Sequence, residues 1–442
     1  MMMIIIIIAV QNKVLKRKQT RKTVDRSKSM LDLRSVLPLP SWSNMSVLRE
    51  AEKKILLHLW DSLETEYVPI YSGKWKLRTI SMNKESKATP LVLVHGMGAG
   101  LGLWVLNLQF FARVRPVYAL DLLGFGQSSR PEFPNDPMLA ELEFVESIEE
   151  WRKSMNLDKF ILLGHSLGGF LSTSYAIRYP DRVRHLILAD PWGFPEPPNE
   201  AEQRTPIPTW IEVLARLLQP FNPFAILRAA GPLGPSLVSK LRSDLMQKFG
   251  HLFEDNTVAD YVYHCNAQNP SGEVAFKVMT EGFGWAKYPM INRITDVPAF
   301  IPMTIIYGSR SWVDSGVGWQ VKYMRSDSFV DVQVIKGAGH HVYADRADMF
   351  NLLVSRSCIV IDQHIDRTST LSKRKRMRSE SSPSLSQMES SIRKPLTTRR
   401  SSKNLVSESE VPETDDEKAA RVRFSLAEED DEELNNPNSN SF

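Results

Sequence analysis

Cysteine is scarce in this sequence: only Cys265 and Cys358 occur among 442 residues. Two thiols exclude a disulfide framework and a cysteine zinc cluster, and they suit a reducing compartment. Neither sign of charge is in large excess, since 55 Lys and Arg stand against 51 Asp and Glu. A net charge of +4 is too small for electrostatics alone to hold a nucleic-acid backbone, so we expect no nucleic-acid partner.

The sequence also lacks a run of about 20 apolar residues, the length that is needed to cross a bilayer. Its amino-terminal run, Met1–Val10, is purely apolar but far shorter. Basic residues follow this run instead of preceding it, which is the reverse of a secretory signal, so we expect no secretion. The segment up to Arg34 contains nine basic and two acidic residues. An apolar run followed by basic residues has two interpretations: weak attachment to an anionic membrane face, or an unstructured start.

The composition divides the chain into three segments. Residues 1–34 form a basic amino-terminal segment with an apolar start, which we expect to be disordered. Residues 35–372 have the composition of a globular domain. Residues 373–442 are Ser-rich, carry thirteen basic and fourteen acidic residues, and have few side chains that could form a core. We predict that this charged tail is disordered.

Short apolar runs in the central segment alternate with stretches of helical length. A continuous apolar run indicates a strand whose two faces are both covered, and such strands are typical of a parallel sheet in an α/β protein. The predicted strands are 90–95, 116–121, 159–164, 184–190, 303–307 and 331–335, and helices are predicted at 144–155 and 167–179. The interval from about 191 to 297 breaks the alternation and is rich in proline and aromatic residues, so we interpret it as an inserted helical cap.

The segment Gly164-His-Ser-Leu-Gly-Gly169 follows a predicted strand and precedes a predicted helix. A serine at a tight strand-to-helix turn needs small residues two positions to either side, because side chains there would collide with the strand and the helix. Gly164 and Gly168 meet this need. The pattern predicts that Ser166 is a nucleophile, and its alternative is a plain tight turn.

A serine hydroxyl attacks only when a base removes its proton and a carboxylate orients that base. In the expected fold the three follow in the order Ser, Asp or Glu, His. Asp314 and His340 each follow a predicted strand in this order, and we predict them as acid and base. Asp190, at another strand end, is the alternative acid, and His341 is the alternative base.

The oxyanion formed by such an attack needs two N–H donors. Leu167 provides one backbone amide at the start of a helix, and Met97, in the glycine-rich segment after an earlier strand, is the expected second. We expect His95, His165 and His185 to be structural hydrogen-bonding residues. This chemistry requires no metal and no cofactor.

Several segments together resemble the α/β-hydrolases, and more narrowly the abhydrolase-domain four/five group. The residues that carry the resemblance are 121–131, 144–152, 190–195, 261–272 and 340–345, within a region from about Trp42 to Asn351. The resemblance implies an α/β-hydrolase fold: a mostly parallel central sheet, flanking helices and an inserted cap. One branch of the group resembles a lipase that removes acyl chains from N-acyl phosphatidylethanolamine and its lyso form. The other is similar to a lipid-droplet protein that activates a triacylglycerol lipase and has been reported as a lysophosphatidic acid acyltransferase, with asparagine in place of the serine.

Ser166 agrees with the lipase branch, so hydrolysis of phospholipid or lysophospholipid acyl esters is the first hypothesis. Acyl transfer to lysophosphatidic acid is a second, since His340 and Asp345 match the His-x4-Asp acyltransferase signature; Asp345 has an alternative role as the N-cap of the next helix. A lipid-droplet scaffold that binds a triacylglycerol lipase is the third. The resemblance implies a cytoplasmic protein at the surface of lipid droplets or intracellular membranes, with mitochondria as one alternative.

Overall fold

Residues 43–197, 224–253, 255–281 and 284–380 are described by the computed structural model of the chain. The chain divides into two compact units, Met1–Ser372 and Lys373–Phe442. The predicted amino-terminal segment 1–34 lies outside the described residues, as do residues 198–223 of the predicted cap and residues 381–442 of the predicted tail.

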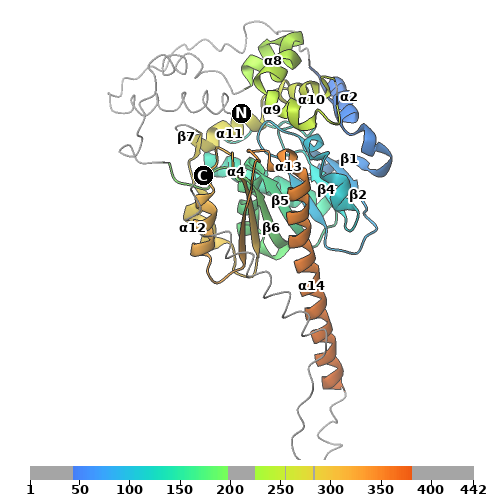
Figure 1. The fold of residues 1–442 in the computed structure, drawn as a ribbon, viewed down its shortest axis with the longest axis vertical. Helices are drawn as coiled ribbons and strands as arrows, with labels where there is room; N and C mark the ends of the chain where they lie inside the picture. Colours follow the sequence, from blue (N-terminus) through green and yellow to red (C-terminus); the bar gives the residue numbers. More distant parts are fainter. Residues whose placement is uncertain (1–42, 198–223, 254, 282–283, 381–442) are drawn as a thin grey trace, which may run out of the picture. The chain divides into compact units, whose positions relative to one another are not determined.

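Eight strands form the central sheet of the first unit, in the order β1-β2-β4-β3-β5-β6-β9-β10 (Figure 1). From β4 to β10 all neighbours are parallel, whereas β1–β2 and β2–β4 are antiparallel. The strands are β1 (Glu64–Ile70), β2 (Trp75–Met82), β3 (Leu91–Val94), β4 (Val117–Leu120), β5 (Phe160–His165), β6 (Val183–Ala189), β9 (Met303–Gly308) and β10 (Val330–Ile335). The last six correspond to the six predicted strands, and the predicted mostly parallel sheet is confirmed.

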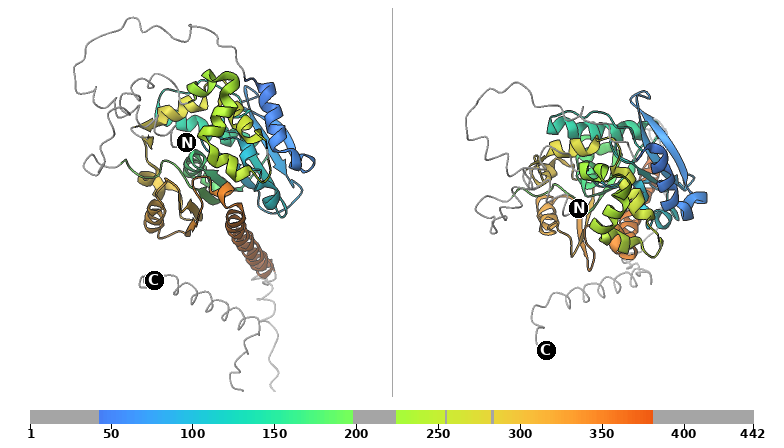
Figure 2. Two further views of the ribbon diagram at one scale, coloured as in Figure 1. Left: turned by 45° about the horizontal axis from the view of Figure 1, so that its top comes forward. Right: turned by 90° about the horizontal axis from the view of Figure 1, so that it is seen from above.

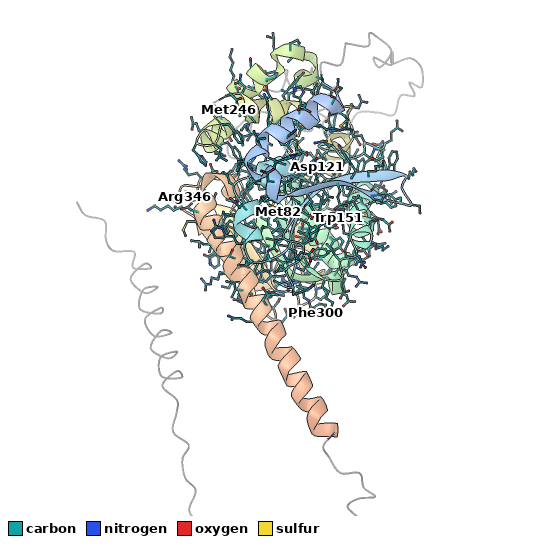
Figure 3. All side chains as sticks on the ribbon, turned by 90° about the vertical axis from the view of Figure 1, so that its right-hand side faces the viewer. Met82, Asp121, Trp151, Met246, Phe300 and Arg346 are labelled. Carbon is teal, nitrogen blue, oxygen red and sulfur yellow. The ribbon has the colours of Figure 1, made fainter. Side chains whose placement is uncertain are left out.

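Both faces of the sheet are buried under helices. Along β5, Phe160 and Leu162 belong to one apolar cluster, and Ile161 and Leu163 belong to the other, because successive side chains of a strand point to opposite faces. The first cluster includes α4 (Pro137–Ser154), α5 (Leu167–Arg178) and α12 (Gly316–Met324). The second includes α2 (Met45–Ile55), α3 (Leu108–Ala112) and α14 (Ala347–Glu380). Figure 3 shows how densely the side chains fill this body.

Helix α4 begins earlier than predicted. The sequence-based helix starts at Phe144, but the carboxylate of Asp136 accepts hydrogen bonds from the amides of Met138 and Leu139 at 2.9 and 3.0 Å. Pro137 occupies the first helical position, where a missing N–H costs nothing. An Asp-Pro pair of this kind is a helix-start signal in the sequence.

The described part of the cap is helical, as predicted. Its helices are α7 (Ala225–Ala229), α8 (Gly234–Leu241), α9 (Ser243–Phe249), α10 (Thr257–Asn266) and α11 (Gly272–Met279), followed by the short strands β7 (Thr280–Glu281) and β8 (Trp285–Ala286). Helix α10 lies beside both α2 and α8 at the same end of the body (Figures 1 and 2). The cap lies over the carboxyl ends of the parallel strands, where Lys248 of α9 forms an ion pair with Asp345.

Beyond the sheet, α13 (Val342–Asp345) is followed directly by α14. Helix α14 continues to Glu380, so it includes residues 373–380 of the segment for which we predicted disorder. Among the described residues, no helix combines the length and the apolar character that crossing a membrane requires.

Candidate active site

Ser166 lies on a sharp turn between β5 and α5. Its backbone has φ 53° and ψ −118°, a conformation that non-glycine residues rarely adopt. A Cβ atom on Gly164 would lie 2.2 Å from the carbonyl oxygen of Gly168, and one on Gly168 would lie 2.4 Å from that of Val94. Both positions therefore require glycine, for the steric reason that the sequence suggested.

His340 contacts Ser166 across the end of the sheet. Its Nε2 lies 3.0 Å from the Oγ of Ser166, and both side chains are buried. The loop after β10 reaches this position because Gly308, at the end of β9, has no side chain: a Cβ there would lie 2.3 Å from the carbonyl oxygen of Gly339. The ring of His341 lies 5.5 Å from that of His340, so the contact with the serine belongs to the first histidine of the pair.

The carboxylate at the other nitrogen of His340 is that of Asp190. Its Oδ2 lies 2.6 Å from Nδ1 of His340, and the side chain is fully buried. Asp190 Oδ1 accepts a hydrogen bond from the amide of Gly308 at 3.1 Å, and Oδ2 accepts one from the hydroxyl of Ser311. Asp190 is thus held by β6, to which it is attached, and by the end of β9.

The prediction of Asp314 as this acid is wrong for the observed geometry. Asp314 is exposed, and its carboxylate accepts from the amide of Gly316 at the start of α12, at 2.8 Å. The sheet order explains the difference: β6 is the direct neighbour of β5, so Asp190 lies next to the turn that carries Ser166, whereas β9 is one strand further away. The loop after β9 contributes Ser311 instead.

Burial shapes the electrostatics of the site. It lowers the pKa of His340 well below its usual value, and the positive charges of Arg242 and Lys248 in the cap act in the same direction. Burial also raises the pKa of Asp190 to about 7, while the hydrogen bonds from Ser311 and Gly308 oppose this rise by stabilising the carboxylate. A neutral imidazole next to the serine can accept its proton.

The backbone segments of the predicted oxyanion donors lie beside the serine. A Cβ on Gly96, the residue before Met97, would lie 2.9 Å from the Cβ of Ser166. Leu167 is the first residue of α5, where amides have no partner within the helix. The loop after β3 and the start of α5 are therefore both near the atom at which negative charge would develop.

Asp345 does not cap the next helix. Its Oδ2 accepts from the amide of Gly339 at 2.8 Å, and its Oδ1 forms an ion pair with Nζ of Lys248, in cap helix α9, at 3.2 Å. The Nδ1 atom of His340 is occupied by Asp190. Asp345 thus ties the turn before His340 to the cap, and its contacts do not form the pair with the His340 ring that the His-x4-Asp signature suggests.

The other buried histidines have structural contacts, as predicted. His165 Nε2 lies 2.9 Å from the carbonyl oxygen of His340, which fixes the loop that carries the catalytic ring. His95 Nε2 accepts from the amide of Leu122 at 3.0 Å. His185 Nε2 lies 2.8 Å from Oγ1 of Thr304. Within the described ranges there is no group of three or more His, Cys, Asp or Glu side chains that could hold a metal ion.

Comparison with known proteins agrees with this architecture. Residues 89–347 match the family Abhydrolase_1, the alpha/beta hydrolase fold. The human protein named (lyso)-N-acylphosphatidylethanolamine lipase is 52% identical over 322 residues, which are 72% of this chain and 94% of that protein. Rat 1-acylglycerol-3-phosphate O-acyltransferase ABHD5 is also 52% identical, over 72% of this chain and 91% of its own. The crystal structure of a membrane phospholipase A, described as a bacterial virulence factor, covers 72% of this chain and 91% of its own, with a TM-score of 0.51 and 19% identity, and shares the fold.

Proposed function

Because the chain belongs to the α/β-hydrolase family and to the group that includes the two kinds of relative named above, we propose that it is a serine lipase acting on acyl esters of phospholipids or lysophospholipids. N-acyl phosphatidylethanolamine and its lyso form are the expected substrates. The observation that carries the proposal is the continuous set of contacts from Ser166 Oγ through the His340 ring to Asp190, at 3.0 and 2.6 Å.

In the proposed reaction the Oγ of Ser166 attacks the ester carbonyl carbon while Nε2 of His340 takes its proton. The amides of Leu167 and Met97 donate to the oxyanion. Asp190 holds the Nδ1–H tautomer of the imidazole and stabilises its positive charge. The protonated His340 then gives its proton to the leaving lipid oxygen, and the ester C–O bond breaks. Water hydrolyses the acyl-enzyme by the same proton transfers in reverse, which releases the fatty acid and restores Ser166.

The cap supports a lipid substrate. Helix α9 is fixed to the loop of His340 through the ion pair between Lys248 and Asp345, so cap residues lie close to the reacting atoms. Arg242 and Lys248 bring positive charge toward His340 and His341. Both cations are ion-paired, Arg242 with Asp244 and Lys248 with Asp244 and Asp345, so they fix the cap beside the site. We place the protein at the surface of lipid droplets or intracellular membranes, where such substrates are found.

Acyl transfer to lysophosphatidic acid is the second candidate, because one relative carries that activity in its name. Both reactions pass through the same acyl-enzyme, and they differ only in whether water or a lipid hydroxyl accepts the acyl group. The third candidate, a scaffold that activates a triacylglycerol lipase, would not need an activated serine. The intact contacts of Ser166 favour an enzyme over this scaffold.

The test is labelling and turnover of the purified protein with Ser166→Ala as the variant. We expect a fluorophosphonate probe to label the wild type, and Ser166→Ala to lose labelling and roughly 10⁶-fold in hydrolysis. Ser172→Ala is the matched control, since this buried serine lies on the same helix and its hydroxyl has no hydrogen-bond partner in the described part of the chain. Ester hydrolysis that survives in Ser166→Ala would refute the lipase, and phosphatidic acid formed in preference to free fatty acid would favour the transferase.

A further inference from the structure

A cavity lies at the opposite end of the strands from Ser166. Its volume is about 660 Å³, within the usual range of small-molecule sites. It is lined by residues at the amino ends of β5, β6, β9 and β10 and by one side of α14. Figure 3 shows Phe300, one of its lining residues, at the end of the body away from Met246 in the cap. The cavity is therefore separate from the proposed active site.

Much of the wall is apolar, and part of it is open to solvent. Phe300 is 66% exposed and Phe329 is 59% exposed, and the two come from the loops before β9 and β10. Val360 and Ile361 of α14 and Val183 of β6 continue the apolar lining. Single exposed apolar residues are common on protein surfaces, but aromatic and aliphatic side chains that converge on one cavity indicate a binding site.

Three cations line the same cavity: Lys159, Arg184 and Arg356. None of their side chains forms a hydrogen bond or ion pair with another residue in the described ranges. One acid, Asp331, also lines the cavity, and its carboxylate accepts a hydrogen bond from Gln333 at 2.8 Å. The described lining thus carries three cations and one acid, and a carboxylate or phosphate would balance the excess positive charge.

A buried polar atom without a partner marks the inner wall. His185 lines the cavity and is only 1% exposed. Its Nε2 lies 2.8 Å from Oγ1 of Thr304, which is in turn 3.1 Å from Oγ of Ser357, another lining residue. Its Nδ1 has no hydrogen-bond partner within the described residues. Because Nδ1 is itself shielded from solvent, a bound molecule would meet the cations and the apolar wall and not this atom.

We propose that this cavity binds a single-chain anionic amphiphile, with its aliphatic chain against the aromatic wall and its carboxylate or phosphate head between Lys159, Arg184 and Arg356. A fatty acid and a lysophospholipid share this chemistry. The proposal depends only on the far end of the sheet, and it stands whether or not Ser166 hydrolyses esters.

Photocrosslinking locates the ligand directly. The probe is palmitate with a diazirine in its chain, added to the full-length Ser166→Ala protein, and the labelled peptides are identified by mass spectrometry. We expect label in the segments 299–302 and 355–361, with loss of this label when unlabelled oleate is added in excess. Label confined to the cap and the segments around residue 166 would overturn the proposal. Absence of label from both 299–302 and 355–361 would overturn it as well.

Removal of the cations tests the head group. The triple variant Lys159→Met/Arg184→Met/Arg356→Met should bind oleate about tenfold more weakly, since each solvent-facing ion pair contributes up to about fivefold. Its binding of oleyl alcohol, which has the same chain without the charge, should be unchanged. The matched control is Lys54→Met/Lys87→Met/Lys322→Met, which removes three exposed cations that do not line the cavity.

Equal weakening of oleate binding in the control triple, or no weakening in the cavity triple, contradicts the proposed head-group contacts. Phe300→Ser, which changes an exposed side chain and is expected to leave the fold intact, should weaken both oleate and oleyl alcohol. Comparison of oleate with oleoyl lysophosphatidate in the wild type then identifies which head the cations prefer.

Discussion

The assignment of Asp190 as the acid of the site makes a sharp prediction for Asp190→Asn. Asparagine has nearly the same shape, and its oxygen can still accept from the amide of Gly308. Its amide nitrogen, however, is a donor and would replace the oxygen that faces Nδ1 of His340 at 2.6 Å. The imidazole would then place its proton on Nε2, facing Ser166, and could not accept the serine proton. The variant should fold but hold the base in the wrong tautomer.

The expected loss is large. The same substitution in a serine protease triad lowers kcat by about 10⁴-fold, which corresponds to about 5.4 kcal/mol at 1.36 kcal/mol for each factor of ten. Asp314→Asn is the matched control, since Asp314 is exposed and an asparagine oxygen can accept from Gly316 equally well. A surface change of this kind alters folding stability by at most about 0.5 kcal/mol, and because Asp314 does not contact His340 the rate should stay close to that of the wild type.

The assay is the initial rate of fatty acid release from N-acyl phosphatidylethanolamine by wild type, Asp190→Asn and Asp314→Asn, with thermal unfolding measured on each protein. We expect all three to unfold at similar temperatures and only Asp190→Asn to lose activity. If Asp314→Asn loses about 10⁴-fold while Asp190→Asn stays within tenfold of the wild type, then the carboxylate next to His340 is not the acid that works in turnover.

Three further predictions address the packing of the fold and the loops of the site. Gly168→Ala should destabilise the fold by about 1–3 kcal/mol in urea unfolding, because its methyl group would lie 2.4 Å from the carbonyl oxygen of Val94; an unchanged midpoint would contradict this. Thr79→Val should cost about 1–3 kcal/mol in the same assay, since it leaves the buried indole N–H of Trp151 without its acceptor at 2.9 Å. Asp345→Asn should reduce hydrolysis and acyl transfer in the same proportion, because this residue positions a loop; selective loss of transfer would instead support the acyltransferase signature.

Much of the sheet could be predicted because its central strands are buried on both faces. The run 159–164 predicts β5 because its four central residues are all large and apolar. Strand β1 was missed for the opposite reason: it is an edge strand whose sequence contains two glutamates and a proline, and only Val68 and Ile70 are buried. Edge strands tolerate such residues, so their patterns are weak.

The candidate site was predictable in part. Ser166 and His340 each have small neighbouring residues that indicate a tight turn. This local pattern allowed both residues to be predicted from the sequence. The acid had no such signal, because Asp190 and Asp314 both follow a strand and both lie between the serine and the histidine in the chain. What distinguishes them is that β6 pairs with β5 while β9 does not, and pairing between strands is a property of the folded sheet.

The same pairing explains how the sheet supports two strained residues at the site. Ser166 and Asp190 both have positive φ, 53° and 47°, and such conformations cost about 1–3 kcal/mol each. The amide of Ser166 donates to Ala189 at 3.1 Å, and its carbonyl oxygen accepts from the amide of Trp192 at 3.1 Å. The amide of Asp190 donates to Ile306 of β9 at 2.8 Å. Three neighbouring strand ends therefore hold the serine and the carboxylate in place before any substrate arrives, and an acid at the exposed position 314 would lack these supports.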